Sequence, residues 1–173
     1  MIRILALAAL LALAPFVHGR SADVAKVEAA FTPGDDISDL IAQRIARSRE
    51  SVRMQAYLFT DRHIAGALYA AMRRGVKVEI VADAAQQQAG GLPLLEPLHR
   101  AGARVYLNTS HAASHNKIVI VDGTTVITGS YNFTQAAQSR NAENVVVISG
   151  NRAITGRFVD NFEYHRSQSS PWP

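Results

Sequence analysis

The sequence predicts an α/β fold in which a mixed, largely parallel central sheet is flanked by helices on both faces. Short apolar runs rich in β-branched residues alternate along the chain with segments whose apolar residues recur at helical spacing. Glycine, proline and aspartate punctuate these segments, and no linker or low-complexity stretch divides the chain. Alternating strands and helices favour a sheet that is covered on both sides.

The elements are expected in a regular order along the chain. A turn at 33–36 carries aspartates that suit the start of a helix, and Asp61 is a second expected N-cap. Gly75 and Gly102 are expected helix ends. Residues 83–91 form a polar, glutamine-rich stretch that we expect to be a loop. Strands are expected at 27–31, 52–59, 76–82, 104–107, 117–121, 124–128 and 145–148, and helices at 37–47, 62–74, 94–101, 134–139 and 152–166.

The N-terminus has the pattern of an export signal. Arg3 is the only charge before an apolar run at 4–17, and small residues suited to cleavage follow. We therefore expect a signal peptide at 1–19, with Ala22 as another cleavage position, and a periplasmic or secreted protein. An uncleaved anchor is the alternative, although the run is short for a membrane span. The rest is expected to be a single catalytic domain at 23–166 and a flexible tail at 167–173.

Composition is compatible with an anionic partner but does not identify one. Without residues 1–19 the chain has 17 basic and 14 acidic residues, a formal net charge of +3, and the sequence pI is about 9.8. This mild basicity suits a polyanion, although a solvated surface explains it equally well. The absence of cysteine excludes a disulfide framework and decides nothing about the compartment.

The most informative stretch begins at His115 and reads H-x-K-x(4)-D. The apolar run after Lys117 predicts a strand, in which alternation places His115 and Lys117 on one face, about 6.5 Å apart. Both can therefore reach one phosphate. Asp122 falls on the opposite face and begins an Asp-Gly turn, so we expect it to position the backbone.

A second motif, G-S-x-N, follows the return strand. Ser130 and Asn132 are two residues apart and share a face in extended backbone, while Gly129 permits close approach of another group. A hydroxyl and an amide beside a lysine suit the non-bridging oxygens of a phosphate. Histidine is a nucleophile near neutral pH when its second ring nitrogen has an orienting partner.

Glu143 is the best candidate for that partner, and a solvated acid at a strand end is the alternative. A metal site is poorly supported, because the chain has no cysteine, no H-E-x-x-H and no carboxylate cluster beside His115. No cofactor is expected. Tyr57 and Phe59 share a strand face, for which core packing is simpler than base stacking. His111 is expected in an exposed loop, with substrate contact as the alternative.

These motifs resemble the HKD motif of the phospholipase D superfamily. The similarity runs from about residue 27 to 166, and the whole chain resembles the small bacterial secreted endonucleases of that superfamily, which act in the presence of chelators. The resemblance implies a phospholipase D/nuclease-like α-β-α sandwich in which His115 forms a covalent phosphohistidine. It further implies that Lys117, Ser130 and Asn132 bind phosphate, that Glu143 orients the histidine and that Asp122 is structural.

The chain carries one such motif, although cleavage through a covalent intermediate needs a nucleophile and a general acid. The other histidines are His18, His63, His99, His111 and His165, and none has a lysine two residues on. A two-fold homodimer with facing motifs is the simplest solution.

We therefore expect a metal-independent, non-specific endonuclease acting on DNA, or RNA, with no stable membrane span after signal cleavage. A phospholipase D that releases phosphatidyl head groups is the alternative, disfavoured because the loops at 83–91 and 108–114 are polar. A non-catalytic nucleic-acid-binding protein is the third hypothesis, which the complete motif argues against.

Overall fold

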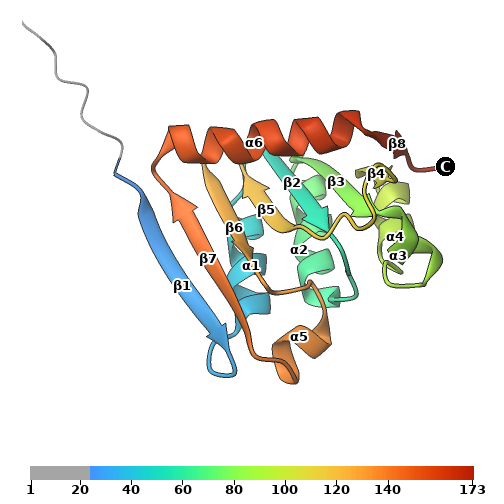
Figure 1. Cartoon of the computed structure of the whole chain (residues 1–173). Coiled ribbons are helices and arrows are strands. Elements are labelled where there is room, and N and C mark those ends of the chain that lie inside the picture. The colour runs from blue at the N-terminus through green and yellow to red at the C-terminus, as the bar shows by residue number, and fades with distance from the viewer. Residues whose placement is uncertain (1–23) are drawn as a thin grey trace, which may run out of the picture.

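The computed structural model describes residues 24–173, which form one eight-stranded sheet with helices on both faces (Figure 1). The expected signal peptide at 1–19 lies outside the described residues. The strands are β1 (Lys26–Thr32), β2 (Ser51–Ala56), β3 (Lys77–Asp83), β4 (Arg104–Asn108), β5 (Lys117–Val121), β6 (Thr125–Gly129), β7 (Glu143–Ser149) and β8 (Ser169–Pro171). The helices are α1 (Ile37–Ala46), α2 (Arg62–Arg73), α3 (Ala84–Gln88), α4 (Leu95–Arg100), α5 (Gln135–Ser139) and α6 (Arg152–Ser167).

The strand order across the sheet is β1-β7-β6-β5-β2-β3-β4-β8. The expectation of a mixed sheet is confirmed, but the expectation that it is largely parallel is wrong. Within residues 24–173 only the β2–β3 and β3–β4 pairs are parallel, and the other five pairs are antiparallel. Parallel neighbours need a crossover connection of a dozen or more residues. A tight turn joins β5 to β6 and the short α5 joins β6 to β7, so these neighbouring strands run antiparallel.

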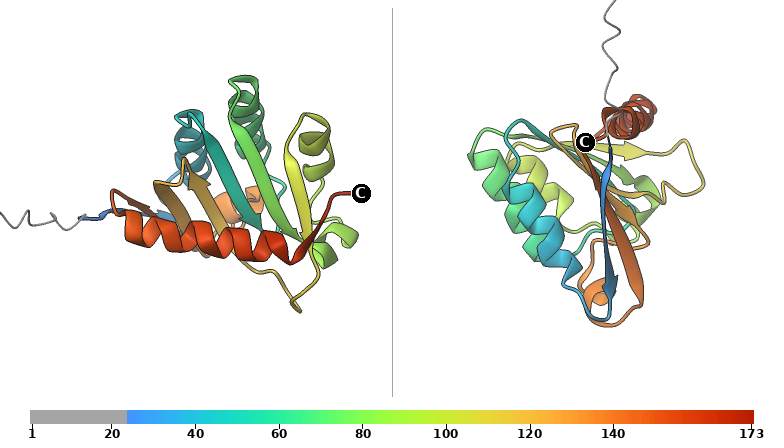
Figure 2. Two further views of the ribbon diagram at one scale, coloured as in Figure 1. Left: turned by 90° about the horizontal axis from the view of Figure 1, so that it is seen from above. Right: turned by 90° about the vertical axis from the view of Figure 1, so that its left-hand side faces the viewer.

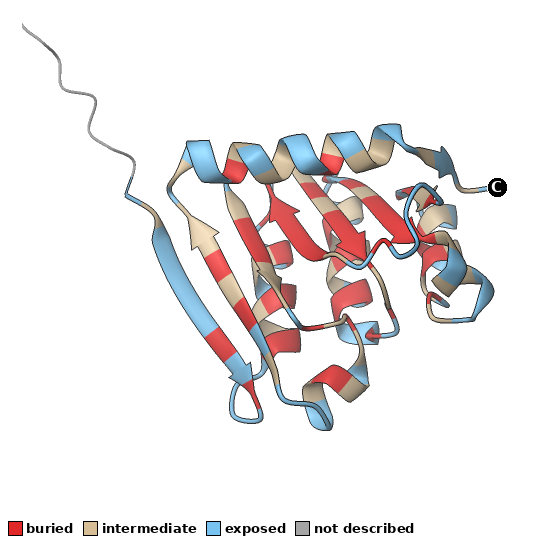
Figure 3. Ribbon diagram, viewed as in Figure 1, coloured by how far each residue is buried: buried red, intermediate tan, exposed pale blue. Residues whose placement is uncertain are grey.

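Two unequal layers cover the sheet, as the perpendicular views of Figure 2 show. α1, α2 and α4 lie on one face over the main core, to which β5 contributes Val119 and Val121. α6 lies on the other face over a smaller cluster that contains Ile118, Ile120 and Phe162. β5 is buried along its whole length because both layers cover it, as Figure 3 shows at the centre of the sheet.

Aspartates begin three of the helices. Asp36 and Asp61 cap α1 and α2 by accepting backbone N–H bonds in the first turn, as their spacing predicts. The expectation of a loop throughout 83–91 is wrong, because Asp83 caps the short helix α3 in the same way.

The end of the chain also differs from expectation. The tail at 167–173 was expected to be flexible, but Ser169–Pro171 forms β8 and pairs antiparallel with β4. The indole nitrogen of Trp172 donates to Glu96 in α4 at 2.6 Å, which fixes the tail further. No helix among residues 24–173 is long and apolar enough to cross a membrane.

Candidate active site

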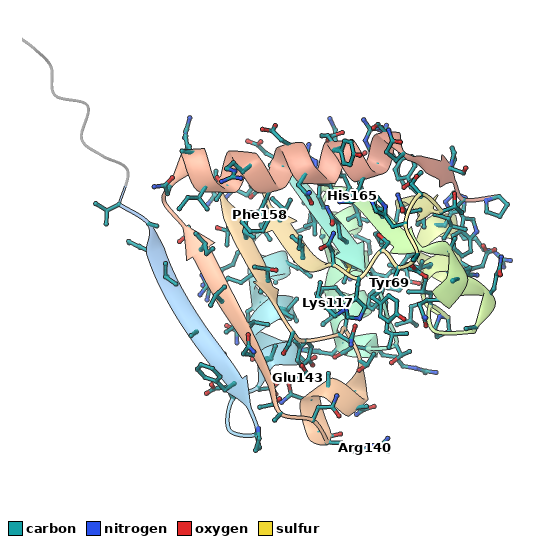
Figure 4. The ribbon with its side chains drawn as sticks, viewed as in Figure 1. Tyr69, Lys117, Arg140, Glu143, Phe158 and His165 are labelled. Atoms are coloured by element: carbon teal, nitrogen blue, oxygen red, sulfur yellow. The ribbon has the colours of Figure 1, made fainter. Side chains whose placement is uncertain are left out.

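His115 and Lys117 stand at the start of the central strand β5. Lys117 is the first residue of the strand and is only 7% exposed, whereas His115 precedes it and is exposed. The Lys117 ammonium donates to the carbonyl oxygen of His115 at 2.8 Å. The backbone of the exposed His115 is thus tied to a cation held in the sheet, at the edge where Figure 4 labels Lys117 and Glu143.

The return strand brings the second motif to the same edge. Thr128 pairs with Ile118 and Gly129 pairs with Val145, so Ser130 emerges beside the first residues of β5 and β7. A Cβ atom built on Gly129 would lie 2.1 Å from the carbonyl oxygen of Asn144, closer than any side chain allows. The motif therefore needs glycine at this position because β7 approaches its backbone directly.

Ser130 and Asn132 alternate along this segment with Tyr131 and Phe133. Ser130 is exposed and Asn132 half-buried, whereas Tyr131 and Phe133 are buried. The Ser130 hydroxyl donates to Glu143 at 2.5 Å and accepts from the backbone N–H of Asn144 at 3.1 Å. The Asn132 side-chain oxygen is buried and has no hydrogen-bond partner among the described residues. This oxygen is an acceptor and would take a donor, whereas the NH2 group of the Asn132 amide is the part that could donate to phosphate oxygens.

Glu143 lies in the site, but its contacts differ from those expected. Its carboxylate accepts from Ser130 and, at 2.9 Å, from Asn141, whereas no hydrogen bond joins it to His115 within the described chain. Thr32 of β1 accepts from its backbone N–H at 3.0 Å. The orientation of His115 by Glu143 therefore stays a prediction.

Charge and burial act against each other at Lys117. Burial lowers the pKa of the Lys117 ammonium below its ordinary value, and the nearby Glu143 carboxylate acts in the opposite direction. The site thus combines a partly desolvated cation, a carboxylate, a hydroxyl and an amide around an exposed imidazole. These groups can hold a phosphodiester and attack it. Residues 24–173 contain no group of three or more metal-ligating side chains.

Asp122 lies at the opposite end of β5, and its carboxylate bonds only to backbone groups among residues 24–173. Its carboxylate accepts from the N–H groups of Arg49, Glu50 and Ser51 at 2.9–3.2 Å, which ties the end of β5 to the start of β2. Burial alone would raise the pKa of this carboxyl, but the N–H donors together lower it. Its φ of 51° is the left-handed conformation that the Asp-Gly turn requires.

Comparison with known proteins identifies the family. Residues 41–166 match the family described as the cardiolipin synthase, phospholipase D-like domain. The chain belongs to this family.

Curated relatives of this phospholipase D-like chain agree. A Rickettsia felis protein named phospholipase D is 42% identical over 137 residues, which are 79% of this chain and 68% of that protein. A mitochondrial cardiolipin hydrolase of Xenopus tropicalis is 33% identical over 119 residues, 69% of this chain and 56% of that one. The chain spans 61–70% of the length of the Rickettsia relatives.

Solved structures confirm the fold. Nuc from Salmonella typhimurium, a phospholipase D family member, superposes with a TM-score of 0.80 at 31% identity, covering 86% of this chain and 99% of that one. NucT from Helicobacter pylori gives a TM-score of 0.78 at 20% identity, with 86% and 100% covered, and supports the fold alone. The sheet flanked by helices is therefore the phospholipase D-like fold.

Tyr57 is a residue of this site that sequence reasoning assigned to the core. Phe59 is fully buried, as core packing predicts, but Tyr57 follows the end of β2 and lies beside the motif. Its ring centre is 4.3 Å from that of His115 and 4.9 Å from the Lys117 ammonium. The strand ends at Ala56, so its alternation of side chains does not extend to Tyr57 and Phe59. The expectation that these two residues share a face was therefore misleading.

His111 is exposed, as its loop position predicts, and its nearest contacts are not with the motif. Its ring bonds to the Asn108 amide oxygen at 3.1 Å and lies 5.1 Å from the ring of His165 in α6. Burial, and the proximity of His111, lower the pKa of His165 below its ordinary value. This pair packs the loop after β4 against α6.

Proposed function

We propose that this phospholipase D-like protein is a metal-independent phosphodiesterase, and specifically a non-specific endonuclease acting on DNA or RNA. The observation that carries the proposal is that the exposed His115 imidazole and the ammonium of the buried Lys117 both lie against the Tyr57 ring, at the start of β5. Ser130 and Asn132 on the adjoining segment complete a site for the phosphate oxygens. The expected export signal makes the periplasm or the medium its place of action.

In the proposed chemistry His115 attacks phosphorus, so that a P–N bond forms as the P–O bond to the leaving group breaks. A second histidine gives its proton to the departing oxygen. The same histidine then takes a proton from water, whose oxygen attacks phosphorus and releases His115. Lys117, Ser130 and Asn132 stabilise the charge on the non-bridging oxygens, and Glu143 remains the proposed orienting residue.

The second histidine is best supplied by another copy of the chain. His63 is paired with Asp39, His99 bonds to Ala103, and His111 and His165 pack on each other. None of these contacts places a second imidazole against His115. Phe31, 57% exposed, lies opposite Asn144 in the β1–β7 pairing, so an apolar side chain borders the site. A homodimer would cover it and bring two motifs together.

The alternative substrate is a phospholipid, and the names of the Rickettsia and Xenopus relatives favour it. The nuclease is supported by the basic composition and by two polar segments near the site. The loop at 109–113, and α3 with its following turn at 84–90, are apolar only at alanine and glycine. A lipase would be expected to engage a bilayer through an apolar segment beside His115, and neither of these two segments is apolar.

The deciding experiment compares both substrates in excess EDTA. Plasmid DNA and vesicles of phosphatidylcholine with cardiolipin are incubated separately with the protein lacking its leader. We expect nicking and linearisation of the plasmid without head-group release. Release of head groups with intact DNA would show that the protein is a phospholipase and not a nuclease. Loss of both activities in EDTA would contradict a metal-independent reaction.

The pH dependence should report Lys117. As the pH rises, activity should begin to fall before the pH reaches the ordinary pKa of lysine. Burial lowers the pKa of Lys117, and only its ammonium form stabilises the phosphate. Glu143→Gln removes the charge that raises this pKa, so the alkaline limb should move to lower pH. The measurement is kcat/KM on a chromogenic phosphodiester as a function of pH, for the unmodified protein and for Glu143→Gln.

Lys117→Arg is the matched control for that profile. A guanidinium stays charged throughout the range, so the limb that Lys117 produces should vanish even if the rate is lower. An alkaline limb unchanged in both variants would assign it to another group.

A further inference from the structure

Asp83 is a buried carboxylate that the proposed chemistry does not use. It is 2% exposed at the end of β3, and both of its oxygens are engaged. One accepts from the backbone N–H of Gln86 at 2.8 Å, and the other accepts from the backbone N–H of Ser114 at 2.7 Å. Ser114 is itself buried and directly precedes His115. One carboxylate thus joins α3 to the segment that presents the nucleophile.

The helix that Asp83 caps reaches His115 by a second route. The Gln86 side-chain amide donates to the Tyr57 hydroxyl at 2.9 Å, and the Tyr57 ring packs edge-on against the His115 ring. The turn after α3 is pressed onto the segment that follows β2, because a Cβ on Gly91 would lie 2.6 Å from Leu58 and 3.0 Å from the Gln86 side chain. The backbone before His115 and the ring of His115 are therefore both held through Asp83.

The residue after His115 is fixed in a comparable way. The Asn116 amide donates to the side-chain oxygen of Gln55 at 2.7 Å, and Gln55, 1% exposed, donates in turn to Asn161 of α6 at 3.2 Å. Buried polar side chains at the ends of neighbouring strands β2 and β3 thus hold the residues on both sides of His115. The imidazole itself remains exposed.

We propose that Asp83 is a positioning residue for His115, acting through the backbone of Ser114 and through Gln86 and Tyr57. The inference rests on the proposed role of His115 as nucleophile. Capping of α3 alone does not explain the position of Asp83. The helix has only five residues, and one carboxylate oxygen of Asp83 accepts from the backbone of Ser114 instead. A reacting atom misplaced by about 1 Å can lose on the order of 100-fold in rate, so a buried acceptor at this point has a direct catalytic consequence.

Asp83→Asn tests the proposal with little change of shape. Both oxygens of Asp83 face N–H donors, so the NH2 group of asparagine must lose one of the two bonds. We expect kcat on a chromogenic phosphodiester to fall by about 10- to 100-fold, with KM within about twofold because the phosphate-binding groups are untouched. The His115 ring signals in nuclear magnetic resonance spectra should broaden or split as the ring samples more orientations.

Asp36→Asn is the matched control. Asp36 caps α1 with a single backbone bond, to Asp39, which an asparagine oxygen can retain. Its kcat and its His115 signals should equal those of the unmodified protein. Tyr57→Phe removes only the hydroxyl that Gln86 holds and keeps the ring, so it supplies a second variant if Asp83→Asn folds poorly.

If Asp83 acts partly through Tyr57, Tyr57→Phe should lower kcat by itself. The double variant should then lose less activity than the two single losses combined. An Asp83→Asn protein with unchanged kcat and His115 signals would overturn the proposal, as would equal losses in Asp36→Asn. Failure of the unmodified protein to cleave any phosphodiester would instead refute the proposed function, while the ring signals would still report whether Asp83 positions His115.

Discussion

Replacement of His115 with alanine should lower plasmid cleavage in EDTA by on the order of 10,000-fold or more, because the nucleophile that forms the P–N bond is lost. Binding of DNA should change little, since Lys117, Ser130 and Asn132 remain. Gel-based nicking assays measure the first quantity and fluorescence anisotropy of a labelled oligonucleotide measures the second. Because His115 is exposed, its replacement should leave the fold intact, and circular dichroism checks this directly.

Ser110→Ala is a suitable control for that substitution. Ser110 lies in the same loop, and its hydroxyl donates to the backbone of Gln168 at 2.8 Å, away from the motif. Its cleavage rate should stay within about twofold of the unmodified rate. Cleavage by His115→Ala at a comparable rate would mean that another residue attacks phosphorus.

Mixed dimers should show that two histidines serve one reaction. Unmodified and His115→Ala chains with different affinity tags are produced together, and the dimers carrying both tags are isolated. We expect this species to be inactive although it holds one intact motif, because the general acid or the nucleophile is missing from its shared site. The nicking rate per dimer is the measurement.

Independent sites would give a different result. A mixed dimer would then retain about half of the activity of the unmodified dimer, since each intact motif would work alone. Dimers isolated in the same way from two unmodified chains with different tags are the control for tag effects. A strictly monomeric preparation with full activity would contradict the shared site outright.

Local sequence pattern was sufficient for the backbone around the motif. The β-branched run after Lys117 predicted a strand, which is β5, and Asp122 was expected to position the backbone. The structure has Asp122 bonded to backbone at the far end of β5. Gly129 was expected to permit close approach, and β7 does approach there. These features depend on neighbours in the chain, which a sequence displays.

What the sequence could not provide depends on distant neighbours. The bond from Ser114 to Asp83 spans 31 residues, and the contact of Tyr57 with His115 spans a greater separation. β8 has three residues and no periodicity, and it forms because β4 offers an unpaired edge. The direction of each strand likewise depends on which strand it pairs with across the sheet, so the alternation of strands and helices did not predict a mainly antiparallel sheet.

The direction of β1 has a practical consequence for attachment. β1 ends at Thr32, which bonds to Glu143 in the site, and begins at Lys26. A strand of that length extends about 20 Å, so whatever is joined ahead of residue 24 enters the fold at the end remote from His115. An affinity handle or a surface linker joined there would lie away from His115 and from the edge at which a second copy is proposed to face it, so this end of β1 suits immobilisation of the protein on a support.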